Sequence, residues 1–229
     1  MSDLRENTPE LVSIEQKSSG WVNAYVLTYR LADGSLYEYE AASRRGLEEY
    51  RAALEANGAG EVARPDAVCI VPLLPDDHIL LIREFRYPLN AWCISFPAGL
   101  LEPGESIEDC ARRELREEVG CTLNDELGAA ALTVLPQAGY SSTGLTEENV
   151  QVVLARAFAD GAAQPERGEL IESFTLHYSE VAGFLAENRD LIGTRAQLVL
   201  EMIKRVWAYR EKLPEEPLPQ QPMTRQDFA

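Results

Sequence analysis

Hydrophobic and polar positions alternate along much of the chain, which is the pattern of half-buried β-strands. Asp33-Gly34 separates two such stretches, Trp21–Leu31 and Ser35–Ala41, and this dipeptide is typical of a tight hairpin turn. These stretches predict a small antiparallel sheet near the N-terminus. The remaining predicted strands are Ala67–Leu74 and His78–Arg86, which form a second hairpin, a short strand ending at Phe96, and the strands Val150–Phe158 and Ser173–Leu176.

Three segments have helical periodicity instead. Leu47–Ala56 predicts a short amphipathic helix closed by Asn57-Gly58. Ser106 predicts the start of a helix to Val119, with Asp109 as capping partner and Gly120 ending it. Thr194–Lys212 predicts a last helix, and one stripe on it holds Val199, Ile203, Val206 and Trp207.

The central predicted helix has two different faces. Ile107, Ala111, Leu115 and Val119 recur every four residues as a buried stripe, whereas three carboxylates, of Glu114, Glu117 and Glu118, converge elsewhere. Two interpretations fit these carboxylates. Arg112, Arg113 and Arg116 could neutralise them in a surface ion-pair lattice, or the carboxylates could bind a hard cation such as Mg²⁺ or Mn²⁺.

Composition narrows the class of protein. The chain has 229 residues and a formal net charge of −17, which disfavours binding to nucleic acids or acidic membranes. No apolar run approaches the ~18 residues that span a bilayer, and Met1–Glu10 lacks the apolar region of a signal peptide, so we expect a cytoplasmic protein. The four cysteines show no metal-binding spacing and predict buried hydrophobic side chains.

The complete spacing around the central helix is specific. Gly99 is followed by five residues, Glu105, seven residues, and then Arg113-Glu114-Leu115-Arg116-Glu117-Glu118-Val119-Gly120-Cys121. This pattern resembles the signature of the Nudix hydrolase family at every fixed position. The resemblance implies an α+β fold: an α/β/α sandwich with a mixed sheet, here preceded by the small antiparallel β-sheet. It divides the chain into an N-terminal β-sheet region with a short helix insertion (1–65), a Nudix domain (66–213) and a loose tail (214–229).

The same resemblance implies metal-assisted hydrolysis of a diphosphate with Mg²⁺, or alternatively Mn²⁺, as the cofactor. Glu114 and Glu118 would be the principal metal ligands, and Glu117 and the Ala98 carbonyl would be further candidates. Arg113 would orient the glutamates, and Glu105 would support the loop. The carboxylates near Glu166–Glu172 could add a ligand, although a turn with solvated acids is favoured.

Features outside this motif resemble ADP-ribose pyrophosphatases and related nucleotide-sugar hydrolases. They are Phe96-Pro97-Ala98-Gly99, the segment Arg83–Pro88, and Pro136, sixteen residues after Gly120. The resemblance implies that Arg86 contacts the substrate, and that Arg44 or Arg45 reaches a phosphate or a base. Ser142–Glu148 resembles a catalytic loop, in which Glu148 is the candidate general base and Glu147 the second choice. Thr143 replaces the proline usual in that loop, and Ser95 replaces a glutamate found in many members.

We therefore expect hydrolysis of ADP-ribose to AMP and ribose 5-phosphate. Two alternatives are hydrolysis of another nucleotide sugar, such as a UDP- or GDP-sugar, and a Nudix-fold module that binds a nucleotide without cutting it. Turnover with Mg²⁺ would distinguish the two kinds of hydrolase from the binding module, which yields no product. The resemblance also implies a homodimer formed through the N-terminal sheet. Trp21 and Trp92 could stack on a base, but packing in the core or an interface is favoured for both.

Overall fold

The computed structural model describes residues 7–61 and 63–210, and it contains two sheets. The predicted tail at 214–229 and the first six residues lie outside the described part of the chain. No helix in the described part is long and apolar enough to cross a membrane. In chain order the elements are β1 (Glu10–Gln16), β2 (Asn23–Arg30), β3 (Leu36–Ser43), α1 (Leu47–Gly58), β4 (Ala67–Leu74), β5 (His78–Arg86), β6 (Ala91–Ser95), β7 (Ala98–Leu100), α2 (Ile107–Val119), β8 (Cys121–Leu123), β9 (Leu132–Val134), β10 (Gly139–Tyr140), β11 (Asn149–Ala159), β12 (Ile171–His177), α3 (Val181–Glu187), β13 (Leu191–Ile192) and α4 (Thr194–Arg210).

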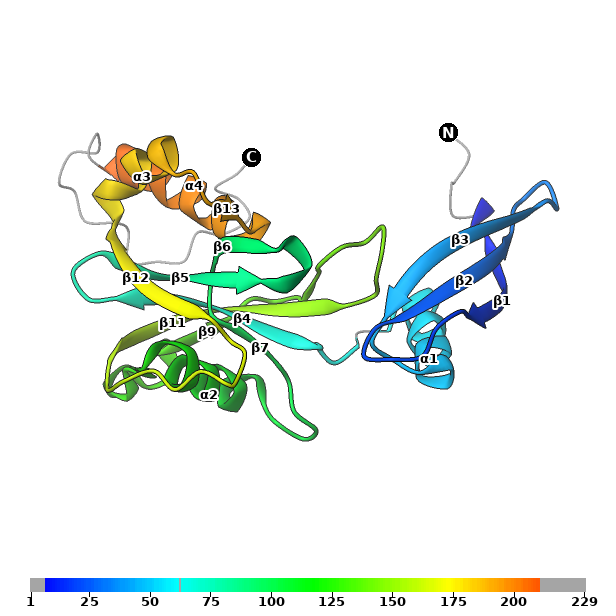
Figure 1. The fold of residues 1–229 in the computed structure, drawn as a ribbon, viewed down its shortest axis with the longest axis horizontal. Coiled ribbons are helices and arrows are strands. Elements are labelled where there is room, and N and C mark those ends of the chain that lie inside the picture. Colours follow the sequence, from blue (N-terminus) through cyan, green and yellow to red (C-terminus); the bar gives the residue numbers. More distant parts are fainter. Residues whose placement is uncertain (1–6, 62, 211–229) are drawn as a thin grey trace, which may run out of the picture.

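The larger sheet lies between two layers of helix, α2 on one face and α3 with α4 on the other (Figure 1). Its central order is β10-β11-β4-β5-β6-β13, and β7, β8, β9 and β12 pair at its sides. Strands β11 and β4 run parallel, as do β6 and β13, whereas β5 is antiparallel to β6 and β12. The sheet is therefore mixed, as the sequence analysis expects.

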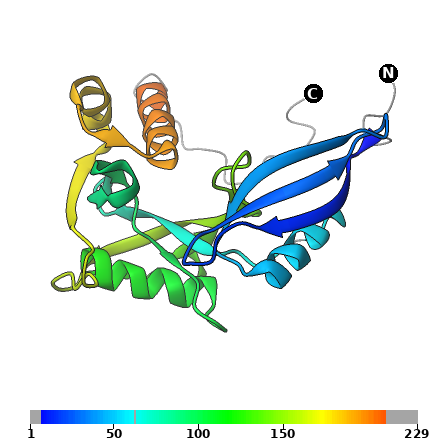
Figure 2. The same cartoon turned by 45° about the vertical axis from the view of Figure 1, so that its right-hand side comes forward.

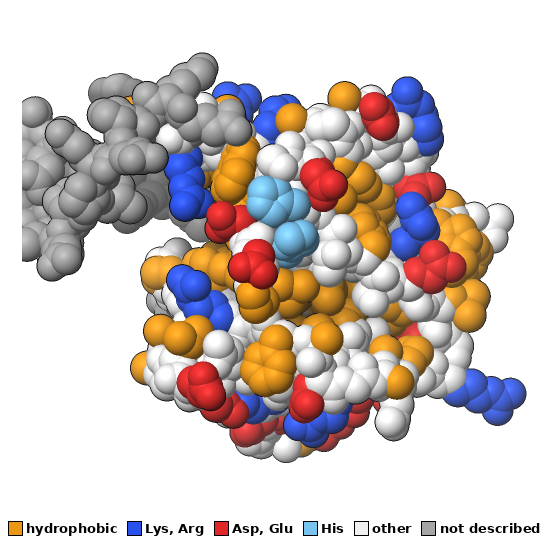
Figure 3. Space-filling model, turned by 90° about the vertical axis from the view of Figure 1, so that its left-hand side faces the viewer, with side chains coloured by type: hydrophobic (Ala, Val, Ile, Leu, Met, Phe, Trp, Pro, Cys, Tyr) orange, Lys and Arg blue, Asp and Glu red, His pale blue; other side chains and the backbone are white. Residues whose placement is uncertain are grey.

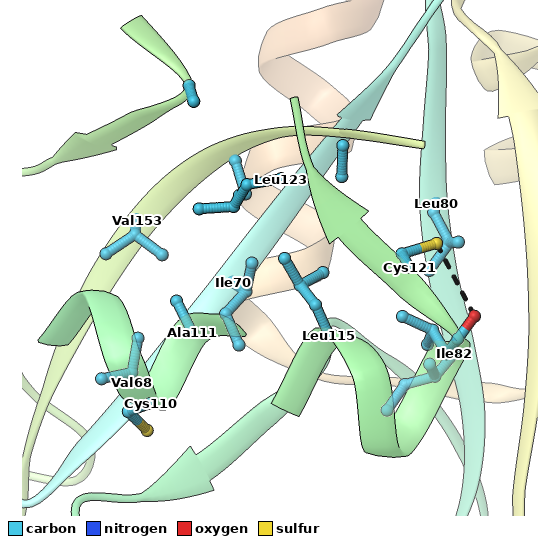
Figure 4. Close-up of a cluster of buried hydrophobic side chains, with 14 residues drawn as sticks. Val68, Ile70, Leu80, Ile82, Cys110, Ala111, Leu115, Cys121, Leu123 and Val153 are labelled. Carbon is cyan, nitrogen blue, oxygen red and sulfur yellow. Dashed lines mark hydrogen bonds between the residues drawn. The ribbon is translucent and has the colours of Figure 1, made fainter. Parts of the chain in front are cut away.

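Burial on both faces explains the apolar character of β4. Val68 and Ile70 face α2 and belong to the cluster around Ala111 and Leu115 (Figure 4). The alternate residues, Cys69 and Val71, belong to the cluster on the α4 side. Because successive side chains of a strand point to opposite faces, a strand covered on both faces has a continuous apolar run.

The N-terminal lobe, defined here as β1–β3 and α1, projects from one end of the larger sheet (Figure 2). Its three strands form an antiparallel sheet in sequence order, and α1 packs on one face of it. Tyr50 of α1 is 2% exposed, and its ring centroid lies 4.4 Å from that of Tyr25 in β2. This packing fixes α1 against the sheet, and Tyr50 is the one fully buried residue of the helix.

The sequence predicts the long elements well and the short ones poorly. The hairpins β2–β3 and β4–β5 and the helices α1, α2 and α4 are confirmed. Strand β1, helix α3 and the two- and three-residue strands are not predicted, and the shortest of these segments contain no measurable periodicity. Val206 is a correction: it is 62% exposed, whereas Ala196 and Leu200 form the buried side of α4. The predicted end of α4 at Lys212 lies outside the described residues.

Candidate active site

The loop and helix of the motif from Gly99 to Cys121 are held by backbone features that the sequence predicts. Ser106 caps α2 by accepting a hydrogen bond from the Asp109 amide at 3.0 Å, and Gly120 ends the helix at φ +61°. Gly99 has a different function. A Cβ atom at this position would lie 1.5 Å from Oε1 of Glu114, so only glycine lets this carboxylate pack against the β7 backbone.

Arg113 is the cation at the centre of the motif. Its Nε lies 2.9 Å from Glu105 Oε1, and its Nη1 lies 2.5 Å from Glu114 Oε1 and 3.3 Å from Glu117 Oε2. The hydrogen bonds from Arg113 lower the pKa of Glu105 below its ordinary value. Arg113 therefore joins the loop, through Glu105, to two of the predicted ligands on the helix.

Glu114 and Glu118 are the buried carboxylates of α2, with 7% and 5% of each residue exposed. Burial raises the pKa of Glu114, although Arg113 opposes the shift. Burial, followed by the charge of Glu114, raises the pKa of Glu118 to about 9. The Ala98 amide donates a hydrogen bond to Glu118 Oε2 at 3.0 Å. Two buried like charges this close need a cation or a proton to offset their repulsion.

The donor set fits a hard divalent cation. Carboxylate oxygens are the available side-chain ligands, and Glu117 adds a third at the edge, where 38% of its side chain is exposed. Within residues 7–61 and 63–210, no group of three or more acidic, histidine or cysteine side chains is arranged so that it could hold a metal ion by itself. A Mg²⁺ ion needs only one or two protein carboxylates, because water and substrate oxygens complete its octahedron, so the buried pair on α2 has the ligand chemistry for it.

Two acidic residues outside α2 also act on this site. The charges of Glu169 and Glu84 both raise the pKa of Glu118, and the charge of Glu169 raises that of Glu114. Glu84 lies in β5, and its own pKa is raised chiefly by burial. Glu84 was not predicted as a site residue, and solvated acids were favoured around Glu169. Their negative charges add to the repulsion among the carboxylates, which a bound cation would offset.

The chain around Glu169 is fixed from two sides. Leu170 O accepts a hydrogen bond from Phe85 N at 3.0 Å, and Gly168 O accepts one from the Tyr87 hydroxyl at 2.9 Å. The Gln164 amide donates to Glu117 O at 2.7 Å. The segment thus crosses from the end of α2 to β5 and brings a carboxylate towards the motif. Sequence offers no signal for this, because the contacts join distant segments.

The predicted substrate arginines and the predicted bases pair with one another. Arg44 forms an ion pair with Glu148, and the Ser141 hydroxyl donates to the other Glu148 oxygen at 2.7 Å. Burial alone would raise the pKa of Glu148, but the hydrogen bonds from Ser141 and Arg44 bring it below its ordinary value. Arg45 bonds Glu147 at 2.6 Å and also pairs with Asp66.

These two pairs differ in accessibility. The Glu147 side chain is 6% exposed, so the Arg45–Glu147 pair joins β3 to the loop in a largely buried position. The Arg44 side chain is 43% exposed and borders a cavity of about 380 Å³. Leu100 and Leu101 of the motif loop line the same cavity. Arg45 lines this cavity too, but both of its terminal nitrogens are engaged, by Glu147 and Asp66.

The remaining predicted residues are an arginine at the end of β5, two tryptophans and the four cysteines. Arg86 ends β5, is 46% exposed in its side chain and pairs with Glu84 at 3.0 Å. Trp92 lies edge-on to Phe85 at 5.9 Å, but Trp21 is 74% exposed and is not part of the core of this chain. All four cysteines are free and buried, as predicted, and burial raises the pKa of each thiol.

The two histidines lie far from α2 in the chain and pack together. Figure 3 shows them side by side on one face, and the rings of His78 and His177 are 5.1 Å apart. His177 also contacts Trp207 edge-on and accepts a hydrogen bond from the Ser179 amide, which begins a helical turn. These contacts give His177 a structural function, because its ring packs against Trp207 and caps the turn that follows.

Comparisons with known proteins identify the family. A model of the NUDIX domain matches residues 63–193. The chain is 32% identical over 209 residues to an ADP-ribose pyrophosphatase of Bacillus subtilis, which covers 89% of this chain and 95% of that protein. It is 30% identical over 193 residues to a Nudix hydrolase of Schizosaccharomyces pombe, covering 78% of this chain and 82% of the relative.

A solved structure described as an ADP compounds hydrolase has the same fold. It superimposes with a TM-score of 0.65 and 23% identity and covers 89% of this chain and 95% of its own. The match of the domain model, the extent of the Bacillus subtilis relative and the intact motif on α2 agree with one another. The chain therefore belongs to the Nudix family and is a Nudix pyrophosphohydrolase.

Proposed function

We propose that this enzyme hydrolyses ADP-ribose to AMP and ribose 5-phosphate in a Mg²⁺-dependent reaction. The observation that supports this most strongly is the buried pair Glu114 and Glu118, which Glu84 and Glu169 surround with further negative charge. The likeness over 95% of a protein named ADP-ribose pyrophosphatase supports the substrate. Glu114 and Glu118 would hold the metal, with Glu117 and the Ala98 carbonyl as further ligands.

The metal, when bound, would cancel charge on the diphosphate, polarise its phosphorus and lower the pKa of a bound water. The residues of the chain then have separate functions. Arg113 keeps Glu114 and Glu117 oriented through the contacts at 2.5 and 3.3 Å, and Glu105 fixes Arg113 in turn. Arg44, at the cavity bordered by Leu100, would bind an anionic group of the substrate. Arg86, exposed at the end of β5, would contact the substrate from that strand.

Three carboxylates are candidates for the general base. Glu148 is the choice from sequence, with Glu147 second; the burial of Glu147 against Arg45 favours Glu148 of these two. A carboxylate with a lowered pKa is a weak base, however, so Glu148 would act after substrate draws Arg44 away. Glu169 is the rival, because its charge already acts on both Glu114 and Glu118. Comparing kcat of Glu148→Gln and Glu169→Gln decides between them: the variant of the base loses far more turnover.

We also propose that the enzyme works as a homodimer. The N-terminal lobe exposes large hydrophobic side chains that a second copy could cover; they are Trp21, Val22, Leu36 and Tyr37, with exposures of 51–74%. Sedimentation equilibrium tests this proposal. A mass near twice 25.5 kDa supports it, and a monomer at micromolar concentration refutes it.

Substrate choice is tested by a panel. The chain would be assayed with ADP-ribose, UDP- and GDP-sugars, dinucleoside polyphosphates and nucleoside triphosphates, each with Mg²⁺ and with chelator. Preference for ADP-ribose supports the proposal. Preference for another nucleotide sugar keeps the mechanism and changes the substrate, and binding without turnover identifies a non-catalytic module.

A further inference from the structure

Segment Tyr140–Glu148 is attached to the N-terminal lobe at several points. The Tyr39 hydroxyl donates to Gly144 O at 2.8 Å, and the Ala42 amide donates to Leu145 O at 2.8 Å. The Ser43 hydroxyl bonds Glu147 at 2.5 Å. These bonds mean that a loop of the Nudix domain takes its position from β3.

Helix α1 adds an attachment of its own. At its C-terminal end, Asn57 Oδ1 accepts a hydrogen bond from the Tyr140 hydroxyl at 2.8 Å. The helix is a firm support, because Tyr50 anchors it in the lobe with 2% exposure. Tyr140 lies in β10, the short strand that pairs with the start of β11. The Asn57–Tyr140 bond therefore joins α1 to the first residue of the segment.

The next residue along the chain contacts Glu148 directly. Ser141 donates its hydroxyl to Glu148 Oε2 at 2.7 Å, and its amide donates to Glu148 O at 2.9 Å. The other Glu148 oxygen is paired with Arg44. If an anionic substrate takes Arg44, Ser141 is the partner that continues to hold the carboxylate. The direction of Glu148 then depends on where Tyr140 places Ser141.

We propose that Asn57 is a positioning residue: through Tyr140 and Ser141 it fixes the carboxylate of Glu148 at the mouth of the Arg44 cavity. This inference rests on the proposed function, in which Glu148 acts on the substrate. It assigns a function to helix α1, which the sequence analysis treats as an insertion. Asn57 touches neither the metal ligands nor the cavity that Arg44 borders, so its effect is on turnover rather than on metal binding.

A double-mutant cycle tests the inference. Asn57→Ala, Tyr140→Phe and the double variant each remove the same hydrogen bond, so each should lower kcat by a similar factor of about three to ten. In all three variants, the Mg²⁺ concentration that gives half-maximal activity and the melting temperature should stay close to the wild-type values. Asn57→Asp keeps an acceptor oxygen and should restore most of the turnover. Tyr209→Phe, on the exposed side of α4, is the matched control and should change nothing.

Amide hydrogen exchange over residues 141–148 is the second readout, and it needs no turnover. Both single variants should exchange faster there than wild type. Additive losses in the cycle, no rescue by Asn57→Asp, or unchanged kcat and exchange would overturn the inference. If wild type cleaves no nucleotide sugar but the loop still exchanges faster in the variants, the proposed function fails while the coupling of α1 to the loop holds.

Discussion

Gly99→Ala is the substitution for which the structure gives the sharpest expectation. The added Cβ would lie 1.5 Å from Glu114 Oε1 and 2.1 Å from Glu114 Cδ. Ordinary carbon contacts begin at about 3.5 Å, so the carboxylate has to move by roughly 2 Å. That movement breaks the 2.5 Å contact with Arg113 and displaces a predicted metal ligand.

The effect on activity should be large and the effect on folding moderate. Misplacing a catalytic group by about 1 Å can cost about 100-fold in rate, so kcat/KM with Mg²⁺ should fall by at least about 100-fold. Overpacking costs about 1–3 kcal/mol, which leaves a typical domain of 5–15 kcal/mol folded. Activity would be measured by AMP release at several Mg²⁺ concentrations, and folding by circular dichroism.

A second glycine provides the control. Gly183 lies in α3, and a Cβ there meets no atom within 4 Å. Gly183→Ala should therefore keep full activity and gain about 0.5–1 kcal/mol of stability, because alanine favours helix. A folded Gly99→Ala variant with activity within threefold of wild type would refute the assignment of Glu114 as a metal ligand.

Three further predictions concern helix α2 and the glycine that ends it. Glu118→Gln should abolish most turnover and leave the fold intact. The Glu118 pKa of about 9 lies above its ordinary value of 4.5, so between these pH values the folded metal-free protein holds a proton that the unfolded chain releases. The free energy of unfolding of wild type should therefore fall as pH rises from 6 to 9, and urea titrations in chelator should find a smaller fall in the variant. Gly120→Ala should destabilise by about 1–3 kcal/mol in the same titrations, because a Cβ at φ +61° would lie 2.5 Å from Gly161 O, and a cost below ~0.3 kcal/mol would contradict this packing. Arg113→Met should weaken Mg²⁺ binding about 10- to 100-fold, since Arg113 orients Glu114, and an unchanged Mg²⁺ dependence of activity would count against that function.

The α2 site could be predicted because its geometry is local. Spacings of three and four residues place side chains on one face of any helix, and Ser106 and Gly120 fix where this helix begins and ends. The structure agrees with that geometry down to the buried pair of Glu114 and Glu118. Arg113, one residue before Glu114, could likewise be placed among the carboxylates from sequence.

The rest of the site depends on contacts between distant segments. Arg44 and Glu148 are 104 residues apart, so no periodicity could show that a predicted ligand-binding arginine pairs with a predicted base. Glu169 is brought to α2 by hydrogen bonds from β5, and nothing in its own segment signals this. The prediction for Val206 is wrong for a related reason. Helical spacing identifies the possible faces of α4, but only the position of the sheet decides which face is buried.

The most direct test of the whole account is AMP release from ADP-ribose by wild type and by Glu118→Gln, each measured with Mg²⁺ and with excess chelator. Wild type with Mg²⁺ should release AMP and ribose 5-phosphate in equal amounts, and the other three conditions should release almost none. Equal turnover by Glu118→Gln, or turnover by wild type in chelator, would contradict a metal-dependent reaction centred on the buried carboxylates of α2.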